Sequence, residues 1–226
     1  GGRAGPMQGS NVVVVIGEGE KEILLTAHYD AVKLRDGTMA DGLVDNAGSV
    51  VALIEAALHD FDQLPADSYL SLNVSPETIL AGALGTVLAD QPLARLMLEV
   101  TEHASVQDYS QLAEALEPLR SKGLRLAVDD AGAGYASFRH ILKLKPDVIK
   151  LDSSLIRNVD SDTGCRALAA ALIRFAEETG CKVVAEGVET QEELAMLRRL
   201  EVNKAQGYLI GRPMPLHHGL AMSRQA

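Results

Sequence analysis

The sequence predicts an α/β protein with the architecture of a TIM-like (β/α)8 barrel. From residue 69 onward, short apolar runs alternate with segments of helical periodicity, and strands that alternate with helices form parallel sheets. The apolar runs are nearly continuous, which is typical of strands buried on both faces. Six such units, together with two β-rich runs near the start of the chain, give the eight strands of a closed barrel.

The N-terminal part differs from this regular pattern. Residues 1–10 are expected to be a flexible tail. Two β-rich runs, 12–16 and 22–27, flank a Gly-containing turn and predict a β-hairpin that supplies the first two strands. A charged loop is expected over 33–45, and apolar residues at a spacing of four predict a helix over 46–60.

The remainder of the chain repeats the order of strand and then helix. The expected strands are 69–74, 95–100, 124–130, 147–152, 182–186 and 203–207. The expected helices are 76–89, 108–122, 135–143, 163–179 and 191–200, with a short helix after the last strand. We therefore expect one barrel domain over 11–226, made of 11–60, 61–216 and a C-terminal end at 217–226.

The composition excludes several classes of protein. The 226 residues carry a formal net charge of −10, whereas a protein that coats a nucleic-acid polymer needs a basic surface. Two cysteines indicate a reducing compartment. No apolar run reaches the roughly 18–20 residues of a membrane span. We expect a cytoplasmic protein without a membrane partner, and the sequence leaves its oligomeric state open.

Polar side chains stand at the ends of the predicted strands. In order along the chain they are Asn73, Glu99, Asp129 with Asp130, Lys150 with Asp152, Glu186, and Gln206. In a parallel barrel these ends meet on one face, where barrel enzymes keep their active sites. Carboxylate and amide oxygens that converge there suit Mg²⁺ or Mn²⁺. The lysine beside them is a candidate base or electrostatic partner.

These residues lie in segments that resemble the motifs of the EAL domain, a barrel that binds and hydrolyses the bacterial messenger cyclic di-GMP. The segments are LNVSP at 72–76, LEVTE at 98–102, VDDAGAGYAS at 128–137, PDVIKLD at 146–152, VVAEGVET at 183–190 and QGYLIGRPMP at 206–215. The resemblance covers about residues 61–216. It implies hydrolysis of one phosphodiester bond of cyclic di-GMP, with two metal ions that clamp the attacking and leaving oxygens.

The resemblance also implies a role for the metal-binding residues. Asn73, Glu99 and Asp129 are expected to be metal ligands. Asp130 is expected to serve a second metal ion. The implied cofactor is Mg²⁺ or Mn²⁺, and the implied ligand is cyclic di-GMP.

Further residues of the site take their expected roles from the same resemblance. Lys150 would help to activate the attacking water, and Glu186 would be an additional acidic residue of the site. Glu189 and Gln206 would support the network of metal and water. Glu102 would brace the loop at 130–135.

Before residue 61 the chain departs from the EAL pattern. The Glu-Ala-Leu motif, whose Glu binds metal, is missing there, and so is the Arg that follows it and contacts the ligand's phosphate. Segments 11–32 and 40–57 instead resemble a zinc aminopeptidase, in which His28 and Asp45 would bind zinc and Asp30 would orient the surroundings of the catalytic water. The other peptidase ligands have no counterpart, so we expect these residues to be vestigial and zinc not to be the cofactor.

We interpret the chain as a chimera, engineered or recombined, in which a peptidase-like hairpin and helix replace the start of the barrel. Three hypotheses remain open. The first is an EAL-like barrel that binds cyclic di-GMP weakly with little or no turnover. The second is a structural chimera with no ligand function. The third is an active metal-dependent phosphodiesterase in which His28 or Asp30 replaces the missing ligand.

Overall fold

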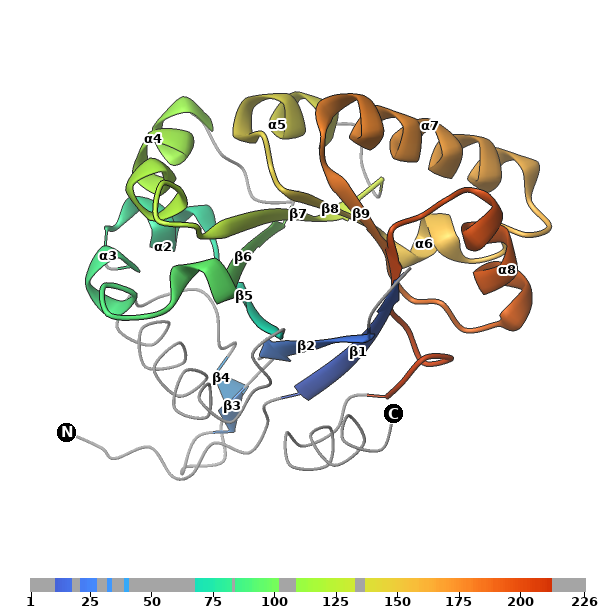
Figure 1. The fold of residues 1–226 in the computed structure, drawn as a ribbon, viewed down its shortest axis with the longest axis horizontal. Coiled ribbons are helices and arrows are strands. Elements are labelled where there is room, and N and C mark those ends of the chain that lie inside the picture. The colour runs from blue at the N-terminus through green and yellow to red at the C-terminus, as the bar shows by residue number, and fades with distance from the viewer. Residues whose placement is uncertain are drawn as a thin grey trace.

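The computed structural model describes residues 11–17, 21–27, 32–33, 39–40, 68–82, 84–101, 109–132 and 137–212. The strands that form its main sheet are β1 (Asn11–Gly17), β2 (Lys21–Ala27), β5 (Tyr69–Asn73), β6 (Leu96–Thr101), β7 (Arg125–Ala131), β8 (Val148–Leu151), β9 (Lys182–Ala185) and β10 (Lys204–Ala205). They close into a barrel in the order β1, β10, β9, β8, β7, β6, β5, β2 (Figure 1). The protein is an α/β protein with a TIM-like barrel.

In the barrel, the strands from β5 to β10 run parallel to one another, and β1 runs in the opposite direction. β2 pairs parallel with β5. β1 pairs antiparallel with β2, from Asn11 opposite Thr26 to Ile16 opposite Lys21. It also pairs antiparallel with β10, where Ile16 stands opposite Ala205. The ring of backbone hydrogen bonds is therefore closed through one antiparallel strand.

Helices cover the outside of the described part of the barrel (Figure 1). They are α2 (Pro76–Leu80), α3 (Leu84–Val87), the 3-10 helix η2 (Leu93–Arg95), α4 (Tyr109–Arg120), α5 (Ser137–Leu144), α6 (Ser153–Ile156), α7 (Thr163–Thr179) and α8 (Gln191–Arg199). Within the residues that the structure describes, none of these helices is long and apolar enough to cross a membrane.

Side chains alternate between the two sides of each strand, and this alternation divides the apolar residues into two clusters. The larger cluster packs strand residues such as Leu70, Leu98 and Ile149 against the helices. The smaller cluster lies on the other side of the strands, within the barrel, and consists of Tyr69, Met97, Ala127, Val148 and Val184. β5 to β9 are thus buried on both faces, as their nearly continuous apolar sequence indicates.

From β5 onward, the predicted strands and helices of the described region are largely confirmed, with three differences. The helix expected over 76–89 is divided into α2 and α3, because the chain turns at Gly82 with a φ of 77°. Glycine tolerates this left-handed conformation best. The single-turn elements η2 and α6 lie in segments for which no helix was expected, since a single turn has too few residues to show a helical period.

The expectation of a continuous loop over 33–45 is wrong in part. β3 (Val32–Lys33) and β4 (Met39–Ala40) form a small antiparallel sheet there. Two-residue strands are too short for an alternating pattern to reveal them. The helix expected over 46–60 and the one after the last strand lie outside the described residues.

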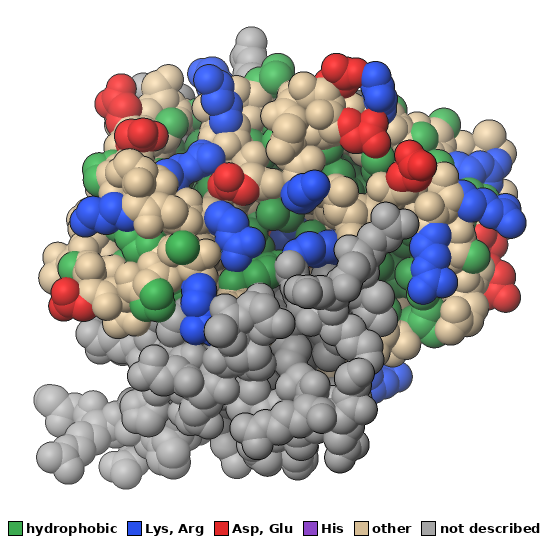
Figure 2. Space-filling model, viewed as in Figure 1, with side chains coloured by type: hydrophobic (Ala, Val, Ile, Leu, Met, Phe, Trp, Pro, Cys, Tyr) green, Lys and Arg blue, Asp and Glu red, His purple; other side chains and the backbone are tan. Residues whose placement is uncertain are grey.

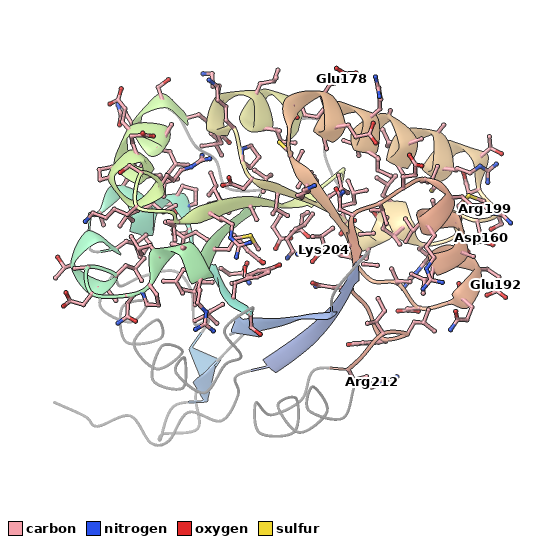
Figure 3. The ribbon with its side chains drawn as sticks, in the orientation of Figure 1. Asp160, Glu178, Glu192, Arg199, Lys204 and Arg212 are labelled. Carbon is pink, nitrogen blue, oxygen red and sulfur yellow. The ribbon has the colours of Figure 1, made fainter. Side chains whose placement is uncertain are left out.

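The end of the barrel at which the parallel strands begin is basic. Arg125 and Lys204 open β7 and β10, and both lie over the ring of Tyr69, with the guanidinium carbon 4.2 Å and the ammonium nitrogen 5.3 Å from its centroid. Figure 3 shows Lys204 within the ring of strands. In the same orientation, Figure 2 shows several Lys and Arg side chains near the middle of the described surface, whereas most Asp and Glu lie toward its outer edge.

The N-terminus of α8 is held by a capping box. The hydroxyl of Thr190 accepts a hydrogen bond from the backbone N–H of Glu193 at 3.1 Å, and the Glu193 carboxylate accepts from the backbone N–H of Thr190 at 3.1 Å. The same carboxylate accepts from Glu189 at 2.9 Å and from Asn158 at 3.1 Å. One buried side chain therefore joins the loop after β9 to the segment after α6.

Replacing Glu193 with Ala is expected to lower the free energy of unfolding by about 2–3 kcal/mol, because three backbone N–H groups lose their acceptor. Burial by itself raises the pKa of Glu193. The hydrogen bonds from Glu189, Asn158 and Thr190 lower it by more than burial raises it, so the net pKa lies below the usual value. The stabilisation is therefore present above the ordinary glutamate pKa and is lost as the pH falls through the lowered one.

Urea unfolding at pH 7 and at acidic pH measures this difference. Glu192→Ala serves as the control, since Glu192 is the exposed neighbour on the same turn. A variant at 193 as stable as the wild type at pH 7 contradicts the assignment.

Candidate active site

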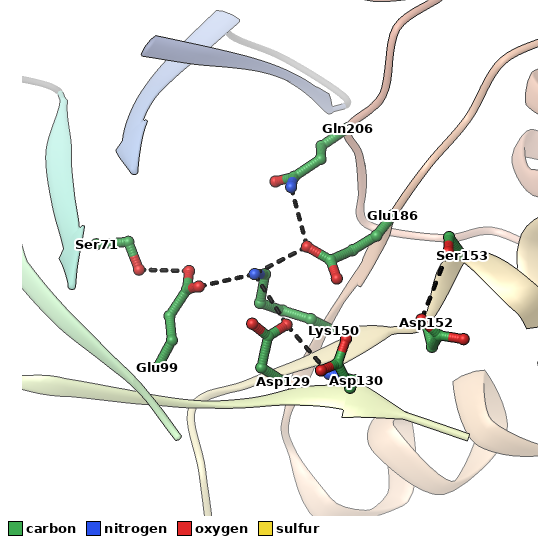
Figure 4. Close-up of polar contacts among 9 residues, drawn as sticks. All are labelled: Ser71, Glu99, Asp129, Asp130, Lys150, Asp152, Ser153, Glu186 and Gln206. Atoms are coloured by element: carbon green, nitrogen blue, oxygen red, sulfur yellow. Dashed lines mark hydrogen bonds and ion pairs between the residues drawn. The ribbon is translucent and has the colours of Figure 1, made fainter. Parts of the chain in front are cut away.

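The ammonium group of Lys150 lies at the centre of a ring of carboxylates inside the barrel. Its Nζ is 2.8 Å from Oε2 of Glu99, 2.9 Å from Oδ1 of Asp129 and 2.8 Å from Oε1 of Glu186 (Figure 4). The Lys150 side chain is only 2% exposed and that of Glu99 is fully buried. These groups come from four neighbouring parallel strands or the residue just after one, so the pairing of these strands brings them together.

Two neutral side chains extend this network on either side. Ser71 Oγ donates a hydrogen bond to Oε1 of Glu99. Gln206 Nε2 donates to Oε1 of Glu186 at 2.9 Å. A continuous chain of polar contacts therefore crosses the barrel from β5 to the residue after β10 (Figure 4).

The loops that follow β9 and β10 approach each other closely. A Cβ atom on Gly207 would lie 2.2 Å from the backbone N and O of Val188, so a side chain does not fit at this position. Val188 N–H donates to the carbonyl of Gln206 at 3.0 Å. The contact between Val188 and the segment 206–207 fixes Glu186 and Gln206 relative to each other, since Glu186 is two residues before Val188 and Gln206 is part of that segment.

The charges of the ring decide the protonation of Lys150. Burial by itself lowers the pKa of Lys150, but Glu99, Glu186 and Asp129 together raise it, and its net pKa lies well above the usual value. The group is therefore an ammonium, which has three donors and no lone pair. Of the two roles considered for this lysine, the geometry favours the electrostatic partner over the base.

Glu186 has the opposite environment. Burial raises the pKa of Glu186 to about 8, the Lys150 ammonium opposes this shift, and the like charge of Asp129 adds to it. A carboxyl group with such a pKa can hold or release a proton near neutral pH.

A second group of oxygens adjoins the ring. Oxygen atoms of Asp129, Asp130 and Glu186 all lie within 4.8 Å of one another, a spacing at which they could share a metal ion. Asp130 adopts a φ of 57°, uncommon for a residue other than glycine, and its N–H donates to Oδ1 of Asp129 at 3.1 Å. Such strain is often found at functional sites.

Asn73 adds a further oxygen at the carboxyl ends of the strands. It pairs with Glu99 across β5 and β6, and its Oδ1 is buried without a hydrogen-bond partner among the described residues. A buried acceptor without a donor is costly unless a ligand satisfies it. These oxygen donors are of the type that Mg²⁺, Mn²⁺ and Ca²⁺ prefer, so the residues present fit a divalent metal ion.

The structure places the remaining predicted residues as follows. Glu189 lies away from the network: its carboxylate is half exposed and is 3.5 Å from Arg157. Its position three residues beyond Glu186, in the loop before α8, turns it outward. Glu102, His28, Asp30 and Asp45 lie outside the described residues. Sequence reasoning missed Ser71, although it stands two residues before Asn73 and so faces the same side of the strand.

Comparison with known proteins gives two family matches. The EAL domain family matches residues 44–213, which is most of the chain. Peptidase family M28 matches residues 11–68, well under half of the chain, and so does not show membership. The two matches overlap between 44 and 68.

Curated relatives include cyclic di-GMP phosphodiesterase NbdA of Pseudomonas aeruginosa, 42% identical over 121 residues, which are 54% of this chain and 16% of NbdA. Probable cyclic di-GMP phosphodiesterase PdeA of Escherichia coli is 30% identical over 212 residues, 88% of this chain and 29% of PdeA. The chain thus spans less than a third of the length of either relative.

Solved structures share the fold. The EAL domain of Mycobacterium smegmatis DcpA has a TM-score of 0.78 and 23% identity, covering 96% of this chain and 95% of that one. Klebsiella pneumoniae BlrP1, solved as a manganese and cyclic di-GMP complex, has a TM-score of 0.74 and 27% identity, covering 90% of this chain and 55% of that one. With the family match over residues 44–213, this chain belongs to the EAL domain family.

Proposed function

We propose that this chain binds cyclic di-GMP with divalent metal ions at the carboxyl ends of its parallel strands and hydrolyses it slowly, as an impaired phosphodiesterase. The observation that carries the proposal is the ring of Glu99, Asp129 and Glu186 around Lys150. Relatives named as cyclic di-GMP phosphodiesterases and a solved manganese and cyclic di-GMP complex support the choice of substrate and cofactor.

Asn73, Glu99, Asp129 and Asp130 are the residues proposed to hold the metal ions. A divalent cation at this place supplies Lewis-acid stabilisation of the charge that develops on the phosphoryl oxygens. The ammonium of Lys150 contributes a fixed positive charge to the same region. Glu186 is proposed to hold or move a proton, and the Gln206 amide orients the Glu186 carboxylate through Oε1.

Impairment is proposed because the Glu-Ala-Leu carboxylate and the Arg that follows it are missing before residue 61, where the family has them. The loss of one carboxylate ligand weakens a metal site. The loss of the Arg removes a bidentate contact to phosphate. The proposed single domain over 11–226, the chimeric origin of residues 11–57 and the replacement of the family's first strands by the hairpin belong to the same proposal. Under it, His28, Asp30 and Asp45 have no catalytic task.

Incubation with cyclic di-GMP and Mn²⁺ is expected to yield the linear dinucleotide slowly, as measured by chromatography at enzyme excess. Asp129→Ala is expected to reduce the rate by about 10²-fold or more, since losing a metal ligand removes several kcal/mol of charge stabilisation. Asp90→Ala, at an exposed position, is the control and is expected to have no effect.

Two results would count against the proposed site, and a third against the proposed impairment. One is the absence of both product and metal-dependent ligand binding in a folded wild-type protein, which favours a structural chimera without a ligand function. The other is unchanged turnover in the Asp129 variant. Turnover as fast as that of an intact family member favours the active phosphodiesterase.

Lys150→Met tests the electrostatics of the ring. In the presence of a chelator, this variant is expected to lose about 3–5 kcal/mol of stability, because buried carboxylates lose their counter-charge. Added Mn²⁺ is expected to recover part of the loss, since a ligand that binds only the folded state stabilises it. Lys182→Met, which removes an exposed lysine on β9, is the matched control. An unchanged melting temperature in chelator contradicts the role given to Lys150.

A further inference from the structure

We propose that Ser71 is a positioning residue, which fixes the orientation of the Glu99 carboxylate so that this group can serve both Lys150 and a divalent metal ion. The proposal rests on the proposed function only in its metal site, and not on the identity of the substrate. Ser71 does not contact the Lys150 ammonium among the interactions of the described residues, so it acts through Glu99.

Ser71 lies at the boundary between two layers of the barrel interior. It stands opposite Met97 on β6, and Met97 belongs to the apolar cluster inside the barrel. Two residues further along β5, Asn73 stands opposite Glu99. The Ser71 hydroxyl therefore meets the Glu99 carboxylate from the side of the apolar layer, and the serine is only 1% exposed.

Both oxygens of the Glu99 carboxylate are engaged. Oε1 accepts a hydrogen bond from Ser71 Oγ, and Oε2 accepts from Lys150 Nζ at 2.8 Å. With two donors on opposite oxygens, the plane of the carboxylate is fixed. Because Glu99 is fully buried, water cannot replace the serine without a local rearrangement.

Loss of this hydroxyl frees the carboxylate to rotate about its last bond. Lys150 then holds Glu99 by a single oxygen, and the remaining lone pairs of the Glu99 carboxylate are no longer in a fixed direction. Partners that orient a metal-binding side chain typically change metal affinity by about 10–100-fold when they are removed. A residue that only fills space does not have this effect on the metal.

Titration of the full chain with Mn²⁺ alone, by isothermal calorimetry, tests the proposal. Ser71→Ala is expected to bind Mn²⁺ about 10-fold more weakly than the wild type. Ser71→Thr keeps the hydroxyl and is expected to retain most of the affinity. Ser68→Ala is the matched control, because Ser68 is equally buried and its contact with Arg95 uses its backbone carbonyl. Melting temperatures show that each variant is folded.

Several results overturn the proposal. They are wild-type Mn²⁺ affinity in folded Ser71→Ala, equal weakening in Ser68→Ala, equal weakening in Ser71→Thr and Ser71→Ala, and no Mn²⁺ binding by the wild-type protein. If Ser71→Ala alone weakens Mn²⁺ binding and the wild type forms no linear dinucleotide, the role of Ser71 stands and the proposed hydrolysis fails.

Discussion

The buried contact between the Lys150 ammonium and three carboxylates is the interaction on which the rest of the site depends. Carboxylates this close repel one another strongly in a medium that excludes water. A cation at 2.8–2.9 Å from each offsets that repulsion and allows them to remain inside the barrel. Because the lysine is supplied by β8, in the middle of the parallel strands, the counter-charge is built into the sheet itself.

The closed sheet places these groups, and its closure depends on the N-terminal hairpin. β1 joins β10 to β2 through backbone pairing, with Gly17 opposite Lys204 and Asn11 opposite Thr26 at its two ends. Backbone hydrogen bonds do not depend on which side chains a strand carries. An antiparallel strand can therefore complete a barrel whose other strands are parallel, provided that its length and twist fit the gap.

Much of this arrangement could be predicted from the sequence, because the rules of a parallel barrel are strict. A polar residue at the end of each apolar run must reach the same face, and this is why Glu99, Asp129, Lys150, Glu186 and Gln206 meet. The side-chain directions of loop residues were harder to predict. Glu189 turns outward toward Arg157, since nothing in the spacing of a loop residue fixes its direction.

Two other features escaped sequence reasoning for physical reasons. Ser71 is one serine among apolar residues, and only its partner Glu99 on the neighbouring strand gives its hydroxyl a role. The break between α2 and α3 occurs where Gly82 takes a left-handed conformation, and glycine within a helical pattern does not by itself decide between a helix and a turn. In both cases the deciding contact or dihedral angle involves the tertiary structure.

The apolar layer within the barrel also determines how solutes can reach the polar ring. Tyr69, Met97, Ala127, Val148 and Val184 separate the basic end of the described strands from the carboxylates. On the described strands, a solute that approaches along the barrel axis from the basic end meets this layer before it meets the carboxylates. A ligand that binds the carboxylates without crossing this layer approaches from the end at which the parallel strands finish.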